Sequence, residues 1–195
     1  SDDFSVTSRN GTTYSVNLSQ GNAASVRVAG AGADSGLLIS RVDRGTAGNQ
    51  FNVQIVDSGL GGGDAVALVG NTLRFTVDVA AGFTAQEAQQ LLANDVTLAS
   101  QFRAVLDKST DTTNAGTGNL TATGVLSFTN GAGPAQTIGD VLALINNDPA
   151  NLAGDSLVTA RLVQTGNGIE LINDGPPSSG SLSITRIGTS SAAED

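Results

Sequence analysis

The sequence offers few residues for acid–base or metal chemistry. It contains no histidine and no cysteine, which excludes Ser–His catalysis, cysteine nucleophiles and the usual zinc or copper ligands. A pair of carboxylates could still hydrolyse a glycosidic bond, and no spacing in the sequence pairs two of the candidates. With one tyrosine and no tryptophan, the chain also lacks aromatic platforms for sugars, so we expect no enzyme and no catalytic, cofactor-binding or metal-binding residues. The carboxylates considered are Asp57, Asp64, Asp107, Glu170 and Asp174.

Two oxygen-rich segments partly match calcium-binding loops. The stretch "GLGGGDAVA" (59–67) matches half of the β-roll nonapeptide, with Leu60 in place of a glycine. A β-roll needs several tandem copies because each turn supplies only part of the ion's shell, so we expect a flexible hairpin loop here. The stretch "DKSTDTTN" (107–114) lacks the central glycine and final glutamate of an EF-hand, and we expect a solvated linker. Weak calcium binding at Gly59–Asp64 or Asp107–Asn114 stays open as an alternative.

The charge of the chain argues against two classes of partner. The formal net charge is −9, and the nine lysine and arginine residues are scattered. Nucleic-acid binding requires a dense cationic surface, and anionic membranes attract clusters of basic residues. No apolar run approaches the length of a membrane span. We therefore expect neither nucleic acid nor membrane as a partner.

Short strands with glycine-rich turns make up most of the predicted structure. Apolar and polar residues alternate on both sides of Asn10-Gly11, which predicts a hairpin with a type I′ turn. Similar alternation predicts a further hairpin around Gly70-Asn71 and another around residues 166–168. Single strands are expected near residues 37–39, 51–55, 102–106 and 181–188.

One unit of the sequence occurs twice. "TLRFTVDVAAGFTAQEAQQLLAND" aligns without a gap with "VLSFTNGAGPAQTIGDVLALINND", 53 residues later. The alignment pairs Thr84 with Thr137 and Glu87 with Asp140, and each pair predicts a capping box at a helix start. Each copy reads as strand, loop, capped helix, loop and strand. Ala88, Leu91 and Leu92 share one face of the first helix, and Ile138, Val141, Leu142 and Ile145 form a stripe on the second. We expect Leu91 and Leu92, and likewise Leu144 and Ile145, to point toward the sheets.

The fold class that follows is α+β, with two small lobes of mainly antiparallel sheet, each packed by a short helix and related by the internal repeat. We expect one lobe from residues 1–21 plus 115–195. An inserted lobe, the degenerate copy with extra strands, would span residues 22–114. Because the first and last segments share a lobe, the two termini should lie close together.

The second copy and the chain end resemble the flagellin hook "IN" motif of flagellins and flagellar hook-associated proteins. The first part of the likeness is "TIGDVLALIN", and the rest runs through "VTA", "GNGIELIND", "GSLSI" and "AAED". The opening hairpin also resembles the strands that precede this helix in the family. The residues that carry the likeness are Thr137, Ile138, Gly139, Asp140, Val141, Leu142, Ile145 and Asn146, then Gly166, Gly168, Leu171, Asp174, Leu182, Ala192, Ala193 and Asp195.

This resemblance implies a structural role as a surface-exposed domain of a bacterial flagellar filament or hook–filament junction protein, located outside the cell. Its partners would be other flagellar subunits, contacted through parts of a longer protein. Since the chain starts "SDDF" without methionine, we expect an excised fragment. The helical termini that polymerise the family are missing from it and its charge of −9 adds repulsion between copies, so we expect a monomer in isolation. The alternative is a binding module of an adhesin or phage tail that recognises a glycan or receptor.

Overall fold

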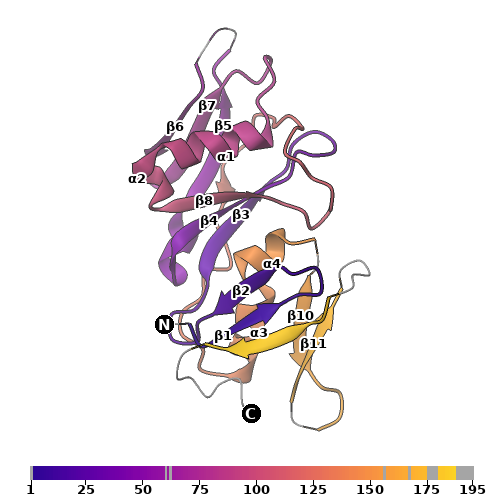
Figure 1. Cartoon of the computed structure of the whole chain (residues 1–195). Helices are drawn as coiled ribbons and strands as arrows, with labels where there is room; N and C mark the ends of the chain where they lie inside the picture. Colours follow the sequence, from indigo (N-terminus) through magenta and orange to yellow (C-terminus); the bar gives the residue numbers. More distant parts are fainter. Residues whose placement is uncertain are drawn as a thin grey trace.

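The computed structural model describes residues 2–59, 61, 63–155, 157–166, 168–174 and 180–187. It has the expected α+β fold, with short helices packed on small, mainly antiparallel sheets. Figure 1 shows two lobes stacked end to end. Two separate hydrophobic clusters underlie them. We call the lobe formed by residues 22–129 the inner lobe, and the lobe formed by residues 2–21 and 130–187 the terminal lobe.

The inner lobe combines two sheets and two helices. The three-stranded antiparallel sheet has the order β3 (Ala23–Val28), β4 (Leu37–Arg44) and β8 (Phe102–Leu106). The four-stranded sheet has the order β6 (Ala65–Val69), β7 (Thr72–Val77), β5 (Asn52–Asp57) and β9 (Leu126–Ser127), with β5 and β7 parallel. Helix α1 (Ala85–Asn94), helix α2 (Val96–Ala99) and the 3₁₀ helix η1 (Thr46–Gln50) complete the lobe.

The core of the inner lobe is aromatic at its centre despite the low aromatic content. Phe102 and Phe128 are both 1% exposed, and their ring centroids lie 5.9 Å apart. The guanidinium of buried Arg41 lies 4.2 Å from the Phe51 centroid and 4.5 Å from the Phe102 centroid. A cation between two rings gains electrostatic attraction from both faces. This arrangement places a charged side chain within the lobe, with Asp43 as its ion-pair partner at 3.3 Å.

The terminal lobe joins both ends of the chain. Its three-stranded sheet has the order β12 (Ser183–Arg186), β1 (Phe4–Thr7) and β2 (Thr13–Val16), all antiparallel. A second hairpin pairs β10 (Val158–Leu162) with β11 (Ile169–Asn173). Helices α3 (Ile138–Asn146) and α4 (Pro149–Ala153) lie between these strands and the inner lobe (Figure 1). The buried core consists of Phe4, Val6, Tyr14, Val16, Leu144, Ile145, Val158 and Ala160.

Both repeat units form the expected capped helices. Thr84 and Glu87 form a capping box at α1, and Thr137 and Asp140 form one at α3. The repeat extends one element further, because an aspartate also caps the short second helix of each unit. These two caps are Asp95 at α2 and Asp148 at α4.

The segment 115–129 packs with the inner lobe, although the lobe boundary was expected at residue 115. Leu120 and Phe128 belong to the core of the inner lobe, and β9 pairs with β5. The backbone of Thr129 also exchanges hydrogen bonds with Ser25 of β3. The first strand of the second repeat copy therefore lies in the inner lobe, while its helices lie in the terminal lobe.

Two local expectations were wrong. Gly11 has φ of 91°, but the φ of Asn10 is not positive, so the turn is not type I′. Instead, Asn10 Oδ1 accepts a hydrogen bond from Thr12 N at 3.0 Å, and a five-residue loop joins the strands. Ile138 was expected in the buried stripe, yet it is 58% exposed. Leu144 and Ile145 are buried as expected, and Val141 and Leu142 pack beside them.

Candidate functional site

The carboxylates considered for glycoside hydrolysis lie in three separate regions. Asp57 and Asp64 flank the loop between β5 and β6, Asp107 follows β8, and Glu170 and Asp174 lie on and after β11. Glu170 Oε2 is ion-paired with Arg161 Nε at 2.9 Å. Asp174 Oδ2 accepts a hydrogen bond from Thr159 Oγ1 at 2.7 Å. These side chains therefore bind their own neighbours within the fold.

The Gly59–Asp64 loop is stabilised by carboxylates that accept backbone amides. Asp57 Oδ1 accepts from Gly59 N at 3.0 Å, and Asp64 Oδ1 accepts from Asp78 N at 3.2 Å. Asp78 Oδ2 accepts from Gly61 N at 3.0 Å, and this hydrogen bond is the first cause that lowers the pKa of Asp78. Backbone amides thus bind one oxygen of Asp57 and one of Asp64, and both oxygens of Asp78, whose Oδ1 accepts from Ala81 N at 3.0 Å. Leu60 lies outside the described residues.

The segment Asp107–Asn114 is a loop that was expected to be a solvated linker. Its middle residues are exposed or partly exposed, but its two end residues are buried and anchor it to the inner lobe. Asp107 is 5% exposed, and its Oδ2 accepts from Arg27 Nε at 2.7 Å. Asn114 is 2% exposed, and its Nδ2 donates to the carbonyl oxygens of Gly36 and Asp107 at 2.8 Å. Hydrogen bonds among these groups and with the backbone offset the free-energy cost of burying them. Among the described residues, no group of three or more acidic side chains is arranged to hold a metal ion.

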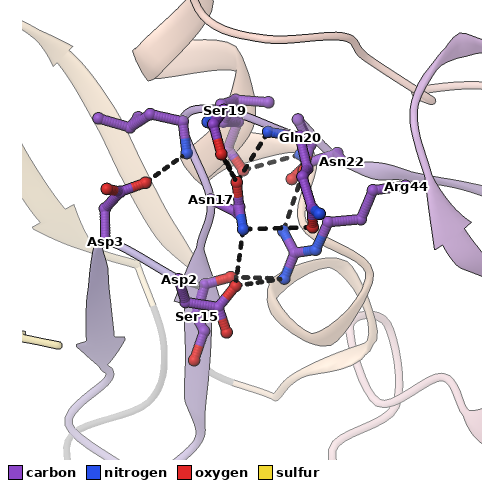
Figure 2. A network of polar contacts seen from close by, with 11 residues as sticks. Asp2, Asp3, Ser15, Asn17, Ser19, Gln20, Asn22 and Arg44 are labelled. Atoms are coloured by element: carbon purple, nitrogen blue, oxygen red, sulfur yellow. Dashed lines mark hydrogen bonds and ion pairs between the residues drawn. The ribbon is translucent and has the colours of Figure 1, made fainter. Parts of the chain in front are cut away.

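A network around Arg44 connects the lobes (Figure 2). Arg44 ends β4 and reaches into the terminal lobe. Its Nη1 donates to Gly21 O at 2.9 Å and its Nη2 donates to Ser15 O at 3.1 Å. The same Nη2 lies 3.4 Å from Asp2 Oδ1, which also accepts from Asn17 Nδ2 at 3.3 Å. One guanidinium of the inner lobe therefore binds three points of the N-terminal segment of the terminal lobe.

Helices α3 and α4 contact the inner lobe through their carbonyl oxygens. Arg27 Nη2 donates to Leu152 O at 2.7 Å, and the backbone amide of Lys108 donates to Ala153 O at 2.8 Å. The last carbonyls of a helix have no partner within the helix. The inner lobe supplies those donors, which fixes α4 against β3 and β4.

A groove of about 370 Å³ lies beside α4, between the lobes. Its inner-lobe side is one face of β4 and β8, because Ser40 and Arg103 are cross-strand partners and share that face. The terminal lobe contributes the N-terminal end of α4. Besides Arg44, the lining includes Ser40, Val42, Arg103, Val105, Asp148 and Ala150.

Asp148 carries the strongest electrostatic perturbation in the groove. It is 7% exposed, and burial raises the pKa of its carboxyl from 3.8 to about 6. The hydrogen bond from Ala150 N at 2.9 Å and the charge of Arg44 lower that pKa and only partly offset burial. Burial, with a smaller effect of the Asp148 charge, raises the pKa of the Tyr14 hydroxyl far above its usual value. Near neutral pH, ionisation of the buried Asp148 carboxyl therefore reduces the stability of the folded state.

Sequence reasoning did not select Arg44, Arg103 or Asp148. One signal was available for Asp148, because the repeat aligns it with Asp95, and an aspartate before a helical segment is a common N-cap. The arginines gave no such signal, since the cross-lobe contacts of Arg44 and the groove position of Arg103 depend on tertiary packing.

Comparisons with known proteins identify no relative of this chain. No family model matches the chain, and no curated protein or solved structure shows significant similarity to it. In the part of the chain that the structure describes, no helix is long and apolar enough to cross a membrane.

Proposed function

We propose that the chain is a structural, non-catalytic domain exposed on the surface of a bacterial flagellar filament or hook–filament junction protein. The observation that carries the proposal is the pairing of β1 with β12. Phe4 lies opposite Arg186, and Ile187 N donates to Asp3 O at 3.0 Å. The chain thus enters and leaves the fold on neighbouring strands. A domain with this geometry can be inserted into a loop of a host protein without disturbing the host's fold.

The residues of the "IN" likeness serve structural purposes, which supports the same proposal. Thr137 and Asp140 form the capping box of α3. Asn146 Nδ2 donates to Ala160 O at 3.0 Å, while its Oδ1 accepts from Ala160 N at 2.7 Å. This pair of hydrogen bonds fixes the end of α3 to β10. Leu171 and Leu182 pack against the core of the terminal lobe. Ala192, Ala193 and Asp195 lie outside the described residues.

The chemistry of the side chains also supports a non-catalytic, structural domain. The chain has no histidine or cysteine, and the candidate carboxylates bind backbone amides, arginines or hydroxyls of the fold itself. A general acid or nucleophile must instead present its reactive atom to substrate. Under this proposal the domain contributes a folded, acidic surface to an assembly, and other subunits are contacted by other parts of a longer protein.

Immunogold electron microscopy tests the proposal on the intact protein. Antibodies raised against the 195-residue chain would be applied to cells of the bacterium that encodes it. We expect gold along the flagellar filament or at the hook–filament junction, and loss of this labelling when the gene is deleted. Labelling of the cell body would favour an adhesin, and labelling of phage particles would favour a tail module. Either result would overturn the flagellar assignment.

A further inference from the structure

Strand β6 is one edge of the four-stranded sheet, and β7 is its neighbour on the other side. The two-residue turn Gly70-Asn71 makes Val69 and Thr72 the first hydrogen-bonded pair of this hairpin. Hydrogen-bonded and non-hydrogen-bonded pairs alternate in an antiparallel ladder, so the backbone N–H and C=O groups of Val66 and Leu68 point away from β7. Among the described residues, these backbone groups have no hydrogen-bond partner.

Several other sheet edges are covered by side chains of the fold itself. Gln89 Nε2 donates to Ala104 O of β8 at 3.1 Å. Asn146 binds both the N–H and the C=O of Ala160 on β10. Arg44 Nη2 donates to a backbone carbonyl of β2. An edge strand offers a row of backbone donors and acceptors to any other strand, and covering those groups prevents unwanted pairing.

Strand β6 lacks both this cover and the usual charged protection of an edge. Its sequence AVALV contains no charged residue and no proline, whereas the edge strands β11 and β12 carry Glu170 and Arg186. Val69 is 56% exposed, and Val66 and Leu68 are only partly buried although they pack against the core. An uncharged, regular edge of this kind is a template for the addition of another strand.

We propose that β6 pairs antiparallel with β6 of a second copy of this chain, about a twofold axis at Ala67. In this register Val66 of one copy lies opposite Leu68 of the other, and these two pairs exchange four backbone hydrogen bonds. Directly opposite residues point to the same face of a sheet, so Val66 and Leu68 of both copies share the face that packs against the core. The small Ala67 side chain lies opposite its own copy at the axis.

The pairing keeps like charges apart, which favours a second copy as the partner. Asp64 precedes β6, so the two Asp64 residues lie at opposite ends of the paired strands. In Figure 1, β6 lies in the part of the inner lobe that is remote from the terminal lobe, so both chain ends stay free. The contact therefore adds to any contacts made by other parts of a longer protein, and it does not depend on the flagellar assignment.

The proposed contact is weak in dilute solution. An edge of five residues per copy is small beside the interface of a stable dimer, and each copy carries a net charge of −9. The dilute chain therefore remains a monomer, and pairing requires a high local concentration of copies.

Sedimentation velocity and NMR of the ¹⁵N-labelled chain, from micromolar to millimolar concentration, test the pairing. We expect a concentration-dependent dimer, with amide shifts centred on Val66 and Leu68. Higher salt should strengthen the association, because it screens the repulsion between copies. A chain that stays monomeric at millimolar concentration and high salt would overturn the proposal, and so would shifts centred on β11 or β12 in place of β6.

Charge variants at the exposed Ala67 test the register. Ala67→Lys and Ala67→Glu each place like charges directly opposite across the axis, so each variant alone should dimerise at least ten-fold more weakly than the parent chain. An equimolar mixture of the two should form a heterodimer, because opposite charges then face one another.

The matched control is Ala122→Lys, which makes the same change in net charge at an exposed position outside β6. It should dimerise like the parent chain, and circular dichroism should show the same fold for all three variants. Equal dimerisation of Ala67→Lys and the parent chain would refute the pairing. A mixture of Ala67→Lys and Ala67→Glu that associates no better than either variant alone would refute the twofold axis at Ala67. None of these results bears on the filament labelling.

Discussion

Asn22 Nδ2 donates a hydrogen bond of 2.8 Å to the carbonyl oxygen of Leu144. This contact joins the entrance of the inner lobe to helix α3 of the terminal lobe, across 122 residues of sequence. Asn22 is 1% exposed, and its backbone also exchanges hydrogen bonds with Ala132. The connection between the lobes is therefore a buried polar contact as well as a covalent one.

Replacing Asn22 with alanine should destabilise the fold. The Leu144 carbonyl would lose a buried donor, and such a loss costs about 1–3 kcal/mol. Urea unfolding followed by circular dichroism measures the change. Asn71→Ala, in the exposed turn between β6 and β7, is the control and should change stability by less than about 0.5 kcal/mol. Equal effects of the two substitutions would show that the contact contributes nothing.

Helix α3 offers a test of which face is buried. Ile145 is 2% exposed and Ile138 is 58% exposed, although both were expected in one stripe. Ile145→Ala should cost about 2–4 kcal/mol, because it removes buried methyl groups and leaves a cavity. Ile138→Ala should cost under about 0.5 kcal/mol in the same urea titration. A larger loss for Ile138 than for Ile145 would contradict the observed orientation of the helix.

Asp148 predicts a pH dependence of stability. Its folded pKa is raised to about 6 from 3.8, so the folded state favours the protonated carboxyl. That contribution is fully present below pH 3.8 and is lost as the pH rises through about 6. Asp148→Asn keeps an N-cap side chain but carries no charge, so it should stabilise the chain at pH 7.5 by up to about 3 kcal/mol.

The matched control for this experiment comes from the repeat. Asp95→Asn makes the same change at the equivalent N-cap of α2, where the aspartate is only partly buried. It should produce no comparable gain at pH 7.5. Thermal melts at pH 4.0 and 7.5 would measure both variants. If Asp148→Asn gained as much at pH 4.0 as at pH 7.5, desolvation of the charge would not be the cause.

Calcium and EDTA should leave the melting temperature unchanged. Asp57, Asp64 and Asp78 already accept backbone amides, and Asp107 is paired with Arg27. A ligand that binds the folded state raises its stability according to its concentration relative to Kd, so a structural ion would reveal itself on chelation. Differential scanning calorimetry in EDTA and in millimolar calcium checks this. A drop of many degrees in EDTA would identify an ion site and favour the adhesive alternative.

Local sequence patterns were sufficient to predict most of the helices and strands. The capping boxes at Thr84 and Thr137 were predictable because the donors and acceptors lie three residues apart. Strands such as β5 and β7 followed from apolar alternation. The turn type at Asn10 was not predictable from the local sequence, because an asparagine side chain can accept a hydrogen bond from a nearby backbone amide and favour another loop conformation.

The candidate site was beyond the reach of these patterns. Ser40, Arg103 and Asp148 are separated by 63 and 45 residues, and no local rule relates them. Their meeting depends on how α4 lies against the sheet of the inner lobe, which the bonds from Arg27 and Lys108 to α4 carbonyls decide.

The sequence by itself determined the α+β class, the capped helix of each repeat copy and the lack of histidine and cysteine chemistry, because these depend on residue type and short spacing. Only the tertiary structure decided that the first strand of the second copy stays with the inner lobe and that Ile138 is left out of the core. Both outcomes have the same physical reason. Several apolar faces compete for burial, and the one that fills a space left by distant segments has the lowest free energy.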